Sequence, residues 1–130
     1  DQGEPAITVV KGQAADTMPA AATQIDGLSG ATLTGDGVNK IILLSHYGYG
    51  GDMSVAAATT GVDVIVGGHS HTLMSNTDPR ALAPYPKIYN DVAVVQAYAF
   101  GAFLGELKVT FDDDGNVIEA VGEPIPMDAR

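Results

Sequence analysis

Two short apolar runs, each followed closely by a histidine, constrain the fold of this chain most. Residues 39–46 read NKIILLSH and residues 62–71 read VDVIVGGHSH. Strands covered on both faces carry such runs, whereas strands with one wet face alternate polar and apolar residues. The intervening residues 52–61, DMSVAAATTG, can form a short helix with Asp52 as its cap and Gly61 as its end. Strand, helix and strand within about 30 residues predict a βαβ unit with a parallel pair.

The chain beyond this unit reads as further sheet. Residues 92–101, VAVVQAYAFG, predict a third buried strand. The stretches GELKVTF and NVIEAV flank DDDG, which predicts an antiparallel hairpin with an Asp-Gly turn. Residues 74–90 hold three of the seven prolines and read as a surface loop. We therefore expect an α/β fold in which a βαβ unit is followed by a C-terminal β-hairpin.

Residues 1–37 differ in character from the rest of the chain. Residues 5–12, PAITVVKG, read as a short strand ended by Gly. Residues 13–37 are rich in Ala, Thr, Gly, Ser and Asp and show no apolar period. This composition predicts a weakly ordered segment that is largely loop, with a boundary near residue 37.

Composition and charge exclude several classes of function. The net charge of -10 repels polyanions, so we expect no binding of nucleic acid polymers. The chain has no Cys, which excludes disulfides and thiolate metal sites. It has no run of about 18 apolar residues, so we expect no membrane span. Because it opens with Asp-Gln-Gly-Glu and not with a basic, apolar leader, we expect a mature product or a fragment.

All three histidines of the chain stand at the ends of the predicted strands. His46 ends the first, and His69 and His71 follow the second. Ligands gather beyond the carboxyl ends of parallel strands, which lie about 4.8 Å apart, so the two end loops can converge. Neutral imidazole binds Zn, Mn or Fe, and Gly67 and Gly68 leave room for a tight backbone turn. The pattern favours a divalent-metal site over three unrelated polar histidines.

The same stretches resemble part of a known enzyme family. GVNKIILLSHYGY, GVDVIVGGHSHT, VAVVQAYAFGAFLGELKVTFDDDGNV and GEPI follow one another across about residues 37–126. They are similar to the second half of the catalytic domain of bacterial 5'-nucleotidases, which are calcineurin-like metallophosphoesterases. The resemblance implies a partial metallophosphoesterase-type sheet. It implies a dinuclear centre of Zn, Mn or similar ions, with His46 and His69 on one metal and His71 on the other.

The resemblance also implies a substrate and a location. The full enzymes hydrolyse nucleotides or other phosphate esters, and we expect a periplasmic or extracellular protein. The family's Asp-x-His, Gly-Asp and Gly-Asn-His-Glu motifs do not occur in residues 1–37. The last of these supplies the histidine that stabilises the leaving group, so the resemblance assigns no catalytic residue to this chain. We therefore expect a fragment that is inactive alone.

A second stretch resembles a different family. Residues 26–34, DGLSGATLT, are similar to the flavin-attachment site of FMN-binding domains, and residues 5–38 to a flavin-carrying component of the sodium-translocating NADH:quinone reductase. There a flavin transferase joins FMN to the last Thr of the motif, which is Thr34 here. The alternative function is thus a covalent FMN carrier in electron transfer with a flavin transferase as partner. Its candidate residues are Asp26, Ser29, Gly30, Ala31, Thr32 and Thr34.

The two resemblances predict a chain joined from two pieces. Residues 1–37 form a flavin-carrier-like segment, and residues 38–130 form the C-terminal half of a metallophosphoesterase domain. An ordinary Ser/Thr/Gly loop remains the alternative for the first piece. An α/β piece with no activity of its own remains the third hypothesis for the whole chain.

Overall fold

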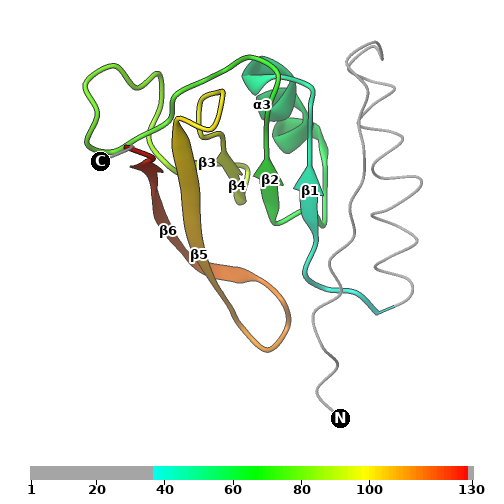
Figure 1. The fold of residues 1–130 in the computed structure, drawn as a ribbon. Coiled ribbons are helices and arrows are strands. Elements are labelled where there is room, and N and C mark those ends of the chain that lie inside the picture. The colour runs from blue at the N-terminus through cyan, green and yellow to red at the C-terminus, as the bar shows by residue number, and fades with distance from the viewer. Residues whose placement is uncertain (1–36, 129–130) are drawn as a thin grey trace.

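The computed structural model describes residues 37–128, and this part of the chain contains one helix and six strands (Figure 1). The α/β class, with a βαβ unit followed by a C-terminal hairpin, is confirmed. No helix in this part is long and apolar enough to cross a membrane. In chain order the elements are β1 (Ile42–Leu44), α3 (Tyr49–Ala58), β2 (Val64–Val66), β3 (Lys87–Tyr89), β4 (Val92–Val95), β5 (Phe103–Phe111) and β6 (Val117–Pro126).

Four strands form one mixed sheet in the order β1-β2-β4-β3. β1, β2 and β4 are parallel, as the apolar runs predict, and β3 is antiparallel to β4. The prediction of a loop throughout residues 74–90 is therefore wrong at β3. The three prolines of this stretch indicated a loop. The Lys-Ile-Tyr sequence that follows them nevertheless pairs with the edge of β4, with Lys87 opposite Val94. β-branched and aromatic residues favour such pairing.

The helix begins earlier than the sequence predicts. Gly48, not Asp52, is its N-cap, with a φ of 86° that favours glycine. Asp52 lies in the first turn, where its backbone N–H donates to the Gly48 carbonyl at 2.8 Å and its side chain is buried. The helix ends at Ala58, before Gly61. Capping patterns locate a helix but rarely fix its first residue.

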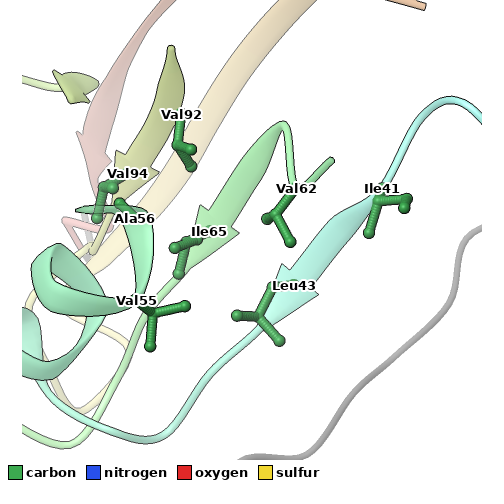
Figure 2. Close-up of a cluster of buried hydrophobic side chains, with 8 residues drawn as sticks. All are labelled: Ile41, Leu43, Val55, Ala56, Val62, Ile65, Val92 and Val94. Atoms are coloured by element: carbon green, nitrogen blue, oxygen red, sulfur yellow. The ribbon is translucent and has the colours of Figure 1, made fainter. Parts of the chain in front are cut away.

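Three residues that lie opposite one another on neighbouring strands form the centre of the main core. Leu43, Ile65 and Val94 face one another across β1, β2 and β4, and all three are buried. Val55 and Ala56 of α3 cover the same face of the sheet (Figure 2). Burial of each large aliphatic side chain contributes about 1.5–3 kcal/mol to folding. This face holds the two histidine-bearing strands in a fixed relation.

The opposite face of the sheet is less completely covered. Leu44 and Val66 remain 40% and 38% exposed. Val95, the register partner of Val66, is buried on this side in a second cluster. Leu107 of β5 packs against that cluster, which consists of Met74, Tyr85 and Val95. The hairpin is thereby attached to the sheet through β4.

β5 and β6 form the predicted antiparallel hairpin (Figure 1). Its turn is closed by Asp112, whose carboxylate accepts hydrogen bonds from the Asn116 backbone and side chain at 2.8 and 2.9 Å. At the other end, Glu123 of β6 accepts a 2.8 Å hydrogen bond from the Asn76 backbone and another from the Ser75 hydroxyl. This carboxylate ties the hairpin to the loop that precedes β3.

Candidate functional site

His46 and His69 lie together beyond the carboxyl ends of β1 and β2. Their ring centroids are 5.1 Å apart and the ring planes meet at 75°. The strand ends explain this proximity, because Leu44 pairs with Val66 and the Ser45 N–H continues the pairing to the Val66 carbonyl at 2.9 Å. Both imidazoles are exposed and accessible to a ligand.

His71 takes a different direction. Its ring meets that of Phe100 edge-to-face at 5.0 Å, and Phe100 is itself 89% exposed. The structure thus brings two of the three predicted ligands together and places the third against an aromatic ring. Among residues 37–128, no three His, Asp or Glu side chains gather closely enough to hold a metal ion. A role for the three histidines in metal binding stays a prediction.

The backbone at the histidine pair is unusual. His69 and His71 have positive φ values of 71° and 51°, a region that few residues other than glycine adopt, although His is enriched there. Such conformations persist where the surroundings hold them, and they concentrate at functional sites. Gly68 lies directly against His46, since a Cβ on Gly68 would stand 3.2 Å from the His46 Nδ1 atom. Two exposed imidazoles above a glycine turn fit a divalent ion as part of a larger ligand set.

Asp52, which the sequence predicts as a helix cap, is a buried acid beneath the histidine-bearing loops. It is 1% exposed, and its Oδ1 accepts a 2.5 Å hydrogen bond from the Ser45 hydroxyl, which also accepts one from the Tyr47 N–H at 3.1 Å. Burial raises the pKa of Asp52 to about 6, against the opposing effect of the Ser45 hydrogen bond. A lone acid in an apolar helical stretch is the sequence signal that could have identified it.

Replacement of Asp52 by Asn should stabilise the chain at neutral pH. Because the folded-state pKa is raised from 3.8 to about 6, folding favours the protonated acid, and this contribution is lost as the pH rises through about 6. The Asp52→Asn variant lacks this loss, so its free energy of unfolding at pH 7 should exceed that of the wild type by about 3 kcal/mol. Urea denaturation between about pH 4 and pH 7 measures both pH profiles.

The same change at an exposed position provides the control. Asp114 is exposed in the hairpin turn, and Asp114→Asn should change the free energy of unfolding at pH 7 by no more than about 0.5 kcal/mol. A lower stability of Asp52→Asn at pH 7 would show that the ionised carboxylate is needed in the fold.

Residues of the described part of the chain line two cavities, which lie at opposite ends of the sheet. The smaller, about 370 Å³, lies beside His71 between Tyr98, Phe103 and Arg80. The larger, about 680 Å³, lies at the amino ends of β2 and β4, away from the histidines. The smaller cavity is the one associated with the candidate site, because it adjoins a predicted ligand.

The flavin-attachment motif cannot be placed in this fold. Its residues, Asp26, Ser29, Gly30, Ala31, Thr32 and Thr34, lie outside the described part of the chain, as does the predicted strand at residues 5–12. The division of the chain near residue 37 therefore stays a prediction.

Comparison with known proteins relates the chain to nucleotidases. No protein-family model matches it. It is 49% identical to the snake venom 5'-nucleotidase of Naja atra in an alignment of 102 positions that covers 72% of this chain and 19% of that protein. The 5'-nucleotidase precursor of Thermus thermophilus has a TM-score of 0.73 and 40% identity, covering 86% of this chain and 23% of that one.

A third comparison agrees with the first two. The NAD nucleotidase of Haemophilus influenzae has a TM-score of 0.70 and 29% identity, covering 85% of this chain and 21% of that one. The chain spans 17% to 25% of the length of the snake venom relatives it matches. These comparisons do not support the flavin-carrier alternative, whereas they confirm the resemblance to 5'-nucleotidases. In sequence and in fold, most of this chain is therefore similar to one segment of the 5'-nucleotidases.

Proposed function

We propose that this chain is part of a metal-dependent phosphoesterase that hydrolyses nucleotide 5'-phosphates. The proposal rests on the His46–His69 pair at the ends of adjacent parallel strands, in a chain whose relatives are named 5'-nucleotidases. We assign His46 and His69 to one divalent ion and His71 to a second. The remaining ligands and the group that protonates the leaving oxygen come from outside residues 37–128.

In this proposal the residues of this chain bind the divalent ions and orient the imidazoles that hold them. β1 and β2 fix the spacing of His46 and His69, whose neutral ring nitrogens are the donors. When bound, divalent ions supply Lewis-acid chemistry that polarises the phosphoryl oxygen and eases deprotonation of the attacking water. Phe100, in edge contact with His71, holds that third imidazole beside the smaller cavity. We expect this cavity to open toward the phosphate ester.

We also propose a nucleotide as substrate and a location outside the cytoplasm. The substrate follows the names of the relatives, and the location follows the venom 5'-nucleotidases, since venom is a secreted fluid. The metal identity that we favour is Zn or Mn, because imidazole suits both ions.

A chimera tests this function in a complete enzyme. Residues 37–126 would replace the matching segment of the Thermus thermophilus 5'-nucleotidase, to which the chain is 40% identical. We expect the chimera to release phosphate from AMP in the presence of Zn or Mn. His69→Ala in the chimera should lower kcat/KM by at least about a hundredfold, because the ion that it helps to hold stabilises the developing charge.

The isolated chain serves as the control for the chimera. The chain alone should release negligible phosphate, because half a ligand set cannot align water and phosphate. A chimera that melts cooperatively yet lacks metal-dependent activity would contradict the proposed function, as would full activity in its His69→Ala form.

A further inference from the structure

Gln96 is a buried amide that reaches across the end of the sheet to the loop bearing His69 and His71. It follows β4 directly and is 2% exposed. Its Nε2 donates to the Gly68 carbonyl at 3.0 Å. Its Oε1 accepts from the Thr72 backbone N–H at 2.5 Å. One side chain therefore bonds the backbone immediately before His69 and immediately after His71.

Ser70 adds a second connection between the same groups. Its hydroxyl lies 3.1 Å from the Gln96 Oε1 and 2.8 Å from the Thr72 hydroxyl. It also accepts a 2.9 Å hydrogen bond from the Tyr49 N–H at the start of α3. The segment between the two histidines is thus joined to β4 and to α3. These connections involve β4 and α3, elements that carry neither histidine.

This network lies where the backbone needs support. The positive φ values of His69 and His71 are unfavourable for residues with a Cβ, and they persist when surrounding contacts hold them. The Gln96 amide supplies one donor and one acceptor in a fixed plane, which matches the Gly68 carbonyl and the Thr72 N–H. An apolar side chain of similar size would leave both backbone groups without this partner.

We propose that Gln96 is a positioning residue, which holds residues 69–71 in the conformation that brings His69 to His46. The expected effect of Gln96 on metal affinity rests on the proposed function. Its effect on the loop conformation rests on the hydrogen bonds alone. Gln96 acts through the loop backbone, because its partners are Gly68, Ser70 and Thr72. Hydrogen bonds that orient metal ligands without touching the metal tune its affinity by about 10–100-fold.

Gln96→Met and Asn76→Leu form a matched pair of variants. Asn76 is also an amide that bridges backbone groups, donating to the carbonyls of Tyr85 and Gly122 and accepting from the Tyr85 N–H. Both substitutions replace an amide by an apolar side chain of similar size. They differ in that Gln96 bonds the histidine loop and Asn76 ties the hairpin to the loop before β3.

Two measurements on the full 130-residue chain separate the outcomes. Zinc titration followed by the imidazole NMR signals gives the affinity, and hydrogen exchange of the Thr72 amide reports the loop without metal. We expect Gln96→Met to weaken zinc binding at least about tenfold and to accelerate Thr72 exchange at least about tenfold. Asn76→Leu should leave both quantities within about threefold of the wild type.

The two measurements give outcomes that can contradict the role of Gln96. Equal zinc affinity and equal Thr72 exchange in the two variants would overturn it. If the wild type binds no zinc, the proposed function fails, whereas Thr72 exchange still decides the role of Gln96. If Gln96→Met does not fold, Gln96→Asn replaces it, because the same amide on a shorter side chain cannot reach both Gly68 and Thr72. A folded Gln96→Asn chain with unchanged Thr72 exchange would then overturn the proposal.

Discussion

Simultaneous replacement of His46, His69 and His71 by alanine is expected to abolish specific zinc and manganese binding by this chain. The wild-type chain should bind weakly, because these three imidazoles are a partial ligand set and residues 37–128 bring no third acidic or imidazole ligand to the pair. Imidazole ligates in its neutral form, so affinity should fall as the pH is lowered from about 8 to about 5. Titration calorimetry at several pH values measures both effects.

Single variants distinguish the histidine pair from the third imidazole. His69→Ala should remove most of the affinity for the first ion, whereas His71→Ala should have a smaller effect on it, because the His71 ring lies against Phe100. Equal metal binding by the triple variant and the wild type would eliminate the proposed site, since the acidic surface would then account for the binding.

Ile65→Ala should destabilise the chain by about 3–5 kcal/mol, the largest effect that we expect for a single substitution outside the site. Ile65 is fully buried in the central strand β2, between Leu43 and Val94. Truncation removes buried methyl groups and leaves a cavity that the flanking strands cannot close. The loss is comparable to the whole stability of many small domains, so much of the population should unfold. Urea denaturation measures it.

The next residue provides the control for this substitution. Val66 lies in the same strand but points to the opposite face, where it is 38% exposed. Val66→Ala should therefore cost about 1 kcal/mol or less. Equal losses for Ile65→Ala and Val66→Ala would show that the face beneath α3 is not the main core of this chain.

The strands of this fold were largely predictable because their signal is local. A run such as IILL or VIV predicts a strand of a parallel sheet covered by a helix. The face beneath α3 is buried as expected, whereas Leu44 and Val66 on the other face stay partly exposed. β3 could not be predicted in the same way, because its three residues become a strand through pairing with β4. The position of Asp52 was also missed, since burial of its side chain depends on the approach of Ser45 and not on helix capping.

The placement of His46 near His69 was predictable in part for the same reason. The register between β1 and β2 places the segments that follow these strands side by side, one carrying His46 and the other His69. The direction of His71 depends on its backbone dihedral angles and on its ring contact with Phe100, which no local pattern encodes. The hydrogen bonds of Gln96 could not be predicted from the sequence, because its partners lie 24 to 28 positions away.

β1 occupies one margin of the four-stranded sheet, and its single strand partner within residues 37–128 is β2. Within the described part of the chain, no strand pairs with the outer side of Ile42–Leu44, and such an edge is where a sheet can be extended by another strand. The histidine pair depends on the inner side of β1, toward β2. A strand added at this edge would pair with the outer side of β1 and leave the pairing between β1 and β2 unchanged, so it would not alter the spacing of the two histidine-bearing strands.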